Sequence, residues 1–228
     1  MNLLAFDTST DTLCIAVQRG DALWQHRGPG GAQSSAQLLP AIRRLMGEAG
    51  LEFAALEAIV FGRGPGSFTG LRTACAIAQG LAFGANVPVL PVDTLLAVAE
   101  AARAEHGCND VVAVLDARMN EVYHAPWRWH DGAWHAAGDS GVCAPELLEV
   151  PAGWAVVGNA QAAYGERLAP EARHLAALPT ATALLRLAPA LLATQGSAPA
   201  AAALPLYIRD KVAQTTAERA VARLAAHP

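Results

Sequence analysis

The first 27 residues alternate short apolar runs with polar turns. Apolar segments cover residues 3–6, 13–18 and 22–26, and turn residues fall at positions 7–11 and at Gly20-Asp21. Short runs of this kind, bounded by Asp, Ser, Thr and Gly, are typical of β-strands. The pattern predicts an antiparallel meander of three strands.

Two helices and one strand are predicted next. Residues 34–49 and 69–84 have apolar positions three and four apart, and residues 58–62 form a short apolar run between them. Pro40 cannot donate a backbone hydrogen bond and crowds the preceding turn, so we expect a kink or a late start of the first helix there. The alternation of strands and helices favours an α/β architecture.

A second copy of the opening pattern begins near residue 111. The apolar run 111–115 ends at Asp116, and further strand patterns follow at residues 121–129 and 133–136. The first copy likewise ends its first run at Asp7. The repeated order of strand, Asp, turn, strand, turn and strand predicts an internal duplication, and therefore two lobes with similar cores.

These observations divide the chain into three parts. We expect an N-terminal lobe at residues 1–105 and a degenerate second lobe at residues 106–210. The remaining residues, 211–228, are expected to contain a final helix that packs back on the N-terminal lobe.

Both early helices carry more apolar and small side chains than one buried side requires. The main lines are Leu38, Ile42, Leu45 and Ala49 in the first helix, and Leu71, Cys75, Ala78 and Ala82 in the second. The additional lines are Leu39 and Met46 in the first helix, and Thr73, Ile77, Gly80 and Gly84 in the second. A helix that is apolar on most sides needs cover on more than one side.

Two kinds of cover stay open from the pattern alone: the second lobe of the same chain, or another protein that packs helix against helix. A large exposed apolar patch would be unfavourable on a monomer. The candidate partner-binding residues are Leu39, Met46, Thr73, Ile77 and Gly80.

The sharpest polar motif is the glycine-rich segment 62–70, GRGPGSFTG, between a predicted strand and a predicted helix. Such a corner can present backbone N–H groups to an anion. Its spacing matches neither a P-loop nor GxGxxG, and Pro65 removes one donor. We therefore favour a tight turn capped by the hydroxyl of Ser67 or Thr69.

Single acids and histidines give weaker signals. Asp7 and Asp116 end strands, where a carboxylate can meet a metal-bound phosphate, but lone acids in turns more often accept hydrogen bonds from nearby N–H groups. His130 and His135 lie near an Asp-Gly turn, and alternation along a hairpin explains them without a metal. We therefore assign no catalytic residue, metal ligand or cofactor ligand from the pattern.

Composition indicates the cellular compartment and whether the chain can bind nucleic acid directly. The chain has 228 residues, 53% of them hydrophobic, a formal net charge of −4 and four dispersed cysteines. This fits reduced thiols in the cytoplasm, and we expect no signal peptide and no membrane span. The lack of excess Lys and Arg indicates that any nucleic acid would be contacted only indirectly.

The segments LLAFDTSTDTLCIAV, LLPAIRRLMGEAGL and AIVFGRGPGSFTGLRTACAIAQGLAF resemble the TsaB (YeaZ) family, with further matches at VLDARMNEVYHA and PLYIRDKV. The resemblance implies an actin-like ATPase (ASKHA) fold with two lobes, each with a mixed sheet and flanking helices. It also implies a non-catalytic partner subunit of the complex that forms threonylcarbamoyladenosine next to the anticodon of tRNA.

The same resemblance implies the partners. Members of the family pair through their two early helices with the catalytic subunit TsaD and support an ATPase subunit, TsaE. Self-association as a homodimer is expected when TsaD is absent. One departure is the entry to the first helix, Gln33-Ser34-Ser35, where relatives carry a histidine and where we still expect capping by serine.

The resemblance also speaks against catalysis. The HxxxH metal positions of TsaD fall at Thr94 and Val98, and neither side chain is a useful divalent-metal ligand in place of imidazole. The glycine-rich nucleotide loop is reduced to residues 157–160, VGNA, which leaves room only for weak nucleotide binding. The alternatives are an ATP-dependent phosphotransferase or ATPase that uses Asp7 and Asp116, and a metallopeptidase.

Overall fold

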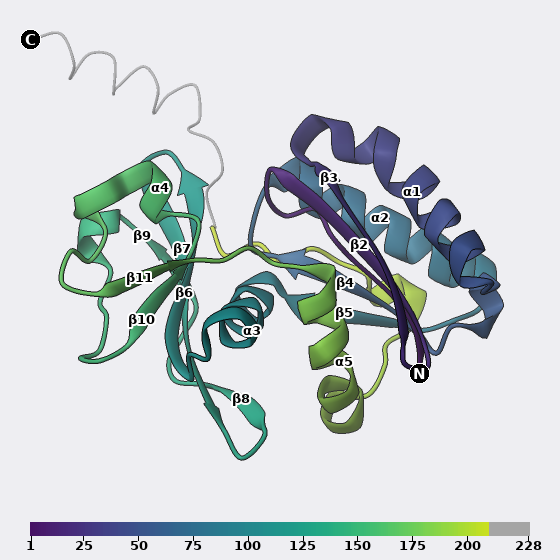
Figure 1. Ribbon diagram of the computed structural model, residues 1–228. Helices are drawn as coiled ribbons and strands as arrows, with labels where there is room; N and C mark the ends of the chain where they lie inside the picture. The colour runs from purple at the N-terminus through teal and green to yellow at the C-terminus, as the bar shows by residue number, and fades with distance from the viewer. Residues whose placement is uncertain (210–228) are drawn as a thin grey trace, which may run out of the picture.

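The computed structural model describes residues 1–209, so the helix predicted within residues 211–228 lies outside the described residues. Two lobes lie side by side (Figure 1), and each is built on one β-sheet. Within residues 1–209, none of the helices combines the length and the apolar character needed to cross a membrane.

The first lobe contains a five-stranded sheet with the order β3-β2-β1-β4-β5. Its strands are β1 (Asn2–Asp7), β2 (Thr12–Arg19), β3 (Ala22–Pro29), β4 (Ala58–Gly64) and β5 (Val89–Asp93). The first three strands pair antiparallel, whereas β4 pairs parallel with β1 and with β5. The predicted meander and the mixed sheet are confirmed.

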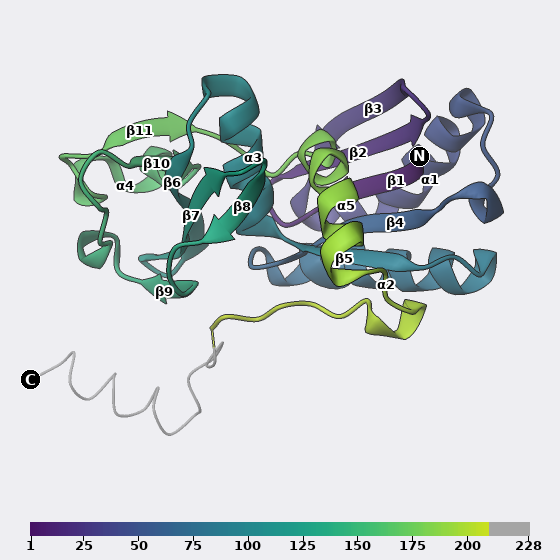
Figure 2. The same cartoon turned by 90° about the horizontal axis from the view of Figure 1, so that it is seen from below.

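Helices cover both faces of this sheet (Figure 2). α1 (Ser34–Ala49) and α2 (Phe68–Ala85) pack on one face, and α3 (Thr94–His106) and α5 (Ala181–Gln195) pack on the other. Alternate residues of β1 divide between these layers, because successive side chains of a strand point to opposite faces: Leu4 and Phe6 face α1 and α2, and Leu3 and Ala5 face the other layer. α1 runs through Pro40 without interruption and begins at Ser34, so the expected late start is wrong.

The second lobe repeats this arrangement. Its strands are β6 (Asp110–Arg118), β7 (Glu121–His130), β8 (Ala133–Ala136), β9 (Gly141–Cys143), β10 (Ala155–Gly158) and β11 (Arg173–Ala176). Read from its other end, the order β8-β7-β6-β10-β11 corresponds strand by strand to β3-β2-β1-β4-β5 of the first sheet, and β9 is added beside β7. Pairing is again antiparallel among β6, β7 and β8, and parallel among β6, β10 and β11. The predicted repeat is therefore confirmed at the level of topology.

The second lobe is degenerate in its helices. Where the first lobe has α1 and α2, the second has a 3-10 turn at Pro145–Leu147 and the short helix α4 (Gln161–Tyr164). α5 returns to the first sheet, where it packs on β1, β2 and β4. The predicted second lobe, residues 106–210, is thus too long: its sheet ends with β11, and the following apolar helix completes the core of the N-terminal lobe.

A buried carboxylate joins the elements between the lobes. Glu100 of α3 is 2% exposed and accepts hydrogen bonds from Arg103, from Arg186 Nε at 2.8 Å and from Trp134 Nε1 at 2.9 Å. Burial raises the pKa of Glu100, but these donors outweigh it and the net pKa is lowered. The ionised carboxylate therefore ties α3 to α5 and β8.

Candidate functional site

Asp7, the last residue of β1, is fully buried. Its Oδ1 accepts hydrogen bonds from Ser9 N at 2.8 Å and Ser9 Oγ at 2.6 Å, whereas Oδ2 makes no hydrogen bond of ordinary geometry among residues 1–209. Burial raises the pKa of Asp7 to about 6, and the Ser9 hydrogen bonds and the nearby Thr94 hydroxyl oppose that rise. The carboxylate therefore serves a local turn, as predicted for lone acids.

Asp116 occupies the equivalent place at the end of β6. Oδ1 accepts hydrogen bonds from Arg118 N and from Tyr164 OH, both at 2.8 Å, and Oδ2 forms an ion pair with Arg118 at 3.0 Å. Burial and the Asp116 carboxylate raise the pKa of Tyr164 to about 12, so the phenol stays a hydrogen-bond donor. Both oxygens of Asp116 are already engaged by neighbours.

The glycine-rich segment 62–70 packs against the turn after β1. A Cβ on Gly62 would lie 1.7 Å from Asp7 Oδ2, and one on Gly70 would lie 1.8 Å from Thr8 O. These glycines are needed because backbone approaches backbone and side chain closely. The segment therefore holds two loops of the first lobe together.

Two backbone donors of this segment are also occupied. Ser67 N donates to Ser9 O at 2.7 Å, and Gly64 N donates to Thr94 Oγ1 at 3.1 Å. The predicted tight turn is confirmed, but its predicted hydroxyl cap is wrong: Ser67 precedes α2 without a side-chain cap hydrogen bond. The predicted serine cap of α1 is wrong for the same reason, since Ser34 Oγ is buried and has no hydrogen-bond partner among residues 1–209.

The two positions at which the family resemblance predicted lost metal ligands lie inside the protein. Thr94 and Val98 are both fully buried in α3. Among residues 1–209, no group of three or more His, Cys, Asp and Glu side chains is arranged to hold a metal ion. His130 and His135 stack with ring centroids 3.8 Å apart, and His130 Nδ1 lies 3.1 Å from Asp131 Oδ2.

The reduced loop after β10 braces the sheet of the second lobe. A Cβ on Gly158 would lie 1.7 Å from Val114 O, so glycine is required at this position. Asn159 Oδ1 accepts a hydrogen bond from Asp116 N at 2.9 Å. The loop is thus held close against the end of β6.

A cavity of about 570 Å3 lies between the lobes. Its walls include Ser9 and Ser67 from the first lobe, Asp116 and Arg118 from the second, and Tyr207 near the end of the described chain. The sequence patterns did not single out Arg118, Tyr207 or Arg209. The only signal for the last two was the segment PLYIRDKV, which matches a family without showing what it contacts.

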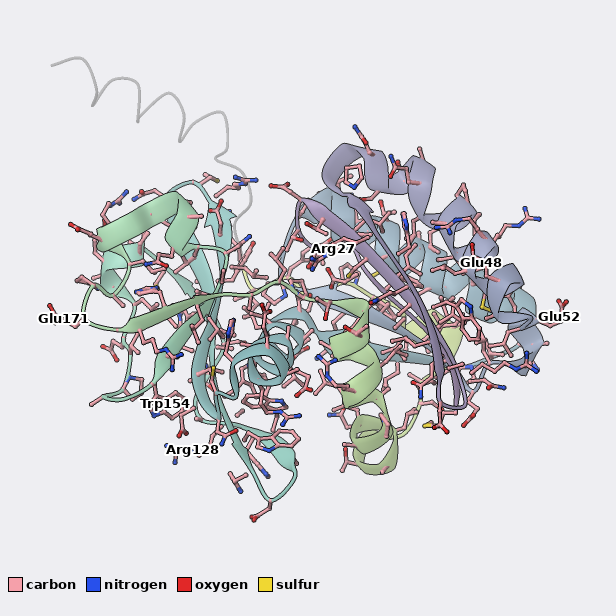
Figure 3. The ribbon with its side chains drawn as sticks, viewed as in Figure 1. Arg27, Glu48, Glu52, Arg128, Trp154 and Glu171 are labelled. Atoms are coloured by element: carbon pink, nitrogen blue, oxygen red, sulfur yellow. The ribbon has the colours of Figure 1, made fainter. Side chains whose placement is uncertain are left out.

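A separate hollow of about 710 Å3 lies on the second lobe and shares no lining residue with the interlobe cavity. Arg128 and Trp154 mark it in Figure 3, with the guanidinium 5.1 Å from the ring centroid. Arg128 is already paired with Asp110 at 2.5 Å. The hollow therefore offers no free charge from this arginine.

The outward sides of α1 and α2 form what we call the two-helix surface, made of Leu39, Thr73, Ile77, Gly80 and Gly84. Leu39 is 36% exposed, Thr73 and Ile77 are half-buried, and a Cβ on either glycine would meet nothing within 4 Å.

A groove of about 490 Å3 runs along the start of this surface. Its lining residues are Ser35, Phe68, Thr69, Arg72, Thr73, Ala76 and Ile77. The second lobe does not provide any of them, so within the described residues the groove is left uncovered by that lobe.

Met46 does not belong to this surface. It is 2% exposed and packs in the core with Leu45 and Ile42, so the prediction that it binds a partner is wrong. α1 turns Met46 toward the sheet because it lies one turn after Ile42 on the inward side of the helix. The other predicted residues remain accessible in whole or in part.

Comparison with known proteins gives one consistent group. A family model described as "TsaD: tRNA N6-adenosine threonylcarbamoyltransferase" matches residues 27–218. The Escherichia coli protein named tRNA threonylcarbamoyladenosine biosynthesis protein TsaB is 32% identical over 224 residues, which cover 93% of this chain and 96% of the relative. A Haemophilus influenzae protein of the same name is 45% identical over 124 residues, covering 54% and 52% of the two chains.

Solved structures agree with these relatives. The structure of YeaZ from Pseudomonas aeruginosa superimposes with a TM-score of 0.85 at 39% identity, covering 90% of this chain and 99% of the other. A further solved structure, described as an uncharacterized protein with similarity to peptidase YeaZ from the same organism, has a TM-score of 0.84 at 39% identity, covering 91% of this chain and 99% of the other.

Proposed function

Because the chain belongs to the TsaB (YeaZ) family and has its actin-like, two-lobed fold, we propose that it is a non-catalytic partner subunit in the formation of threonylcarbamoyladenosine on tRNA. Its proposed partner is the catalytic subunit TsaD, with TsaE as a further subunit of the same assembly. We propose that the subunit acts in the cytoplasm. With a net charge of −4, the chain would meet tRNA only through its partner.

The observation that carries this proposal is the two-helix surface. Ile77 and Leu39 offer apolar contact, and Gly80 and Gly84 let another helix approach the backbone of α2 closely. The family model that matches residues 27–218 is that of TsaD, so the proposed partner shares this fold and would have helices equivalent to α1 and α2. Helix-to-helix packing would then bury both surfaces.

The absence of a catalytic role is supported by how the polar groups are engaged. Thr94 is fully buried, Val98 has no polar side-chain atom, and the carboxylate of Asp116 is bound by Arg118 and Tyr164. Such groups are not free to hold a metal ion or to orient a water molecule. We therefore propose no cofactor beyond weak nucleotide binding.

Substitution of Ile77 by Arg tests the surface. The charge would have to be buried against an apolar partner, so Ile77→Arg should weaken binding of TsaD by at least tenfold. The measurement is size-exclusion chromatography of the chain with purified TsaD, followed by titration calorimetry. Circular dichroism should show an intact fold, because Ile77 is only half-buried.

Gln79→Arg is the matched control. Gln79 is exposed and lies two residues further along α2, on a different side of the helix, so this variant should bind TsaD normally. Normal binding by Ile77→Arg, or equal loss in both variants, would contradict the proposed surface. The same pair tests self-association: only Ile77→Arg should shift a homodimer to monomer in sedimentation velocity.

The interlobe cavity is the one observation that favours the alternative, an ATP-dependent phosphotransferase or ATPase. Calorimetry of the isolated chain with ATP and Mg2+ separates the two. Micromolar binding with turnover would support the enzyme, whereas binding weaker than millimolar with no turnover supports the partner subunit.

A further inference from the structure

The chain passes between the lobes once more near the end of its described part. Residues 204–209, which we call the strap, leave the first lobe and reach the second (Figure 2), and three of them line the interlobe cavity. Leu206 N donates to Arg63 O at 2.7 Å, which fixes the strap to the first lobe. Leu206, Tyr207 and Arg209 are themselves part of the cavity wall.

Tyr207 is held by the start of α2. Its ring stacks on Phe68 with centroids 5.5 Å apart, and its hydroxyl accepts a hydrogen bond from Arg72 Nε at 3.1 Å. The guanidinium of Arg72 also lies 3.8 Å from the centroid of Phe68. This aromatic and cationic contact is the second attachment of the strap to the first lobe.

Arg209 attaches the strap to the second lobe. Its Nη2 donates to Ala117 O at 3.1 Å and to the carboxylate of Glu121, and its Nη1 lies 3.6 Å from Met119 Sδ. The side chain is 14% exposed. All three contacts belong to residues 117–121, which comprise the end of β6, the hairpin turn and the start of β7.

That turn is strained. Arg118, Met119 and Asn120 have φ values of 58°, 55° and 63°. Asn tolerates this left-handed region, but Arg and Met do so only at a cost. The matching turn of the first lobe, residues 8–11, has no residue with positive φ. Strained backbone of this kind persists only where surrounding contacts hold it.

The docked strap also contains a buried polar group that has no hydrogen-bond partner. The Nε–H of Arg209 is buried without a hydrogen-bond partner among residues 1–209. A buried donor without a partner opposes the favourable contacts of the same side chain. Docking of Arg209 is therefore favoured by its ion pair to Glu121 and opposed by two costs, the unpaired Nε–H and the left-handed backbone of residues 118–120.

We propose that residues 204–209 act as a releasable latch: Arg209 and Tyr207 hold the two lobes together across the cavity mouth, and release of Arg209 from the 117–121 turn opens the cavity and relaxes the turn. The remaining ion pair between the lobes at this mouth, Arg118 with Asp11 at 3.0 Å, joins side chains that are 70% and 84% exposed. Exposed pairs of this kind contribute little. The strap is thus the main closure on this side.

Hydrogen exchange of the full chain, followed by mass spectrometry, tests the latch. The double variant Tyr207→Ala, Arg209→Met should speed exchange at least tenfold in peptides covering residues 115–122 and 63–72, because contacts on both sides of the cavity mouth are lost. Peptides from the sheet cores, residues 2–7 and 111–114, should be unchanged. Equal exchange in wild type and variant over residues 115–122 would overturn the proposal.

Two further variants keep the test decisive if the double variant loses its fold. Glu121→Gln leaves the strap intact but removes the charge that Arg209 meets, and it should speed exchange over residues 115–122 and in the strap itself. Arg44→Met removes an exposed ion pair to Glu48 on α1, where neither residue lines the cavity, and it should leave exchange in both segments unchanged. Equal increases of exchange over residues 115–122 in Glu121→Gln and Arg44→Met would overturn the latch.

Discussion

At the scale of single residues, Asp7 shows how a conspicuous acid can serve structure alone. The carboxyl is fully buried, and burial raises its pKa to about 6 from an ordinary value of 3.8. Its one bonded oxygen is occupied by Ser9. The position at the end of β1 was predictable from the sequence, but the direction of the carboxylate was not, because it depends on the close approach of Gly62.

The raised pKa predicts a pH dependence of stability. Between pH 3.8 and about 6 the folded state binds more protons at Asp7 than the unfolded state, so stability falls as pH rises through this window. Asp7→Asn removes the ionisation. Urea denaturation should show the variant gaining about 2 kcal/mol relative to wild type between pH 4 and pH 7. Parallel stability curves for the two proteins would contradict this assignment.

At the scale of secondary-structure elements, α1 and α2 carry the main proposal. The sequence predicted α1 with the observed bounds, residues 34–49, because its apolar spacing is regular and Gly50 ends it in the left-handed conformation. The prediction for α2, residues 69–84, differs from the observed Phe68–Ala85 by one residue at each end. The spacing did not show whether each additional apolar residue faces the sheet or the solvent. For that reason Met46, which faces the core, was predicted to lie on the surface.

Truncation of Met46 and Leu39 separates core from surface on α1. Met46→Ala should lower the free energy of unfolding by about 2–4 kcal/mol, because it leaves a cavity in a packed core. Leu39→Ala should change it by less than about 1 kcal/mol and should instead weaken TsaD binding. Chemical denaturation and calorimetry measure the two effects. Equal destabilisation by both variants would place Leu39 in the core as well.

At the scale of the whole molecule, the lobes are held on two sides. The strap lies at the cavity mouth, and the Glu100 cluster joins α3, α5 and β8. The duplicated strand order was predictable from the repeated hydrophobic pattern, and it is the reason the two-lobed fold could be expected. The return of α5 to the first sheet was not predictable, because an apolar helix does not indicate which of two similar sheets it covers.

Loss of the Glu100 charge should weaken the contacts of α3 with α5 and β8 and lower the free energy of unfolding. Glu100→Gln leaves Arg103 and Arg186 without their buried counter-charge, and we expect a loss of about 2–3 kcal/mol in the free energy of unfolding, discounted because both arginines are partly exposed. Since the pKa of Glu100 is lowered, the contribution is present above the ordinary pKa of 4.5 and lost as pH falls below it. Thermal denaturation at pH 7 and at pH 3 measures both.

The control for this variant is Glu48→Gln, labelled at Glu48 in Figure 3, which removes an exposed pair with Arg44. It should change stability by less than about 0.5 kcal/mol. Equal losses in the two variants would mean that the buried cluster contributes no more than a surface ion pair.

The late return of α5 has a consequence for synthesis on the ribosome. Leu184, Leu187 and Ala188 complete the layer beneath the first sheet. While those residues are still inside the exit tunnel, the emerging N-terminal lobe has its strands, α1, α2 and α3, but α3 covers only part of the sheet face that α5 completes. We therefore expect the apolar core of this lobe to close only after α5, Ala181–Gln195, has left the ribosome.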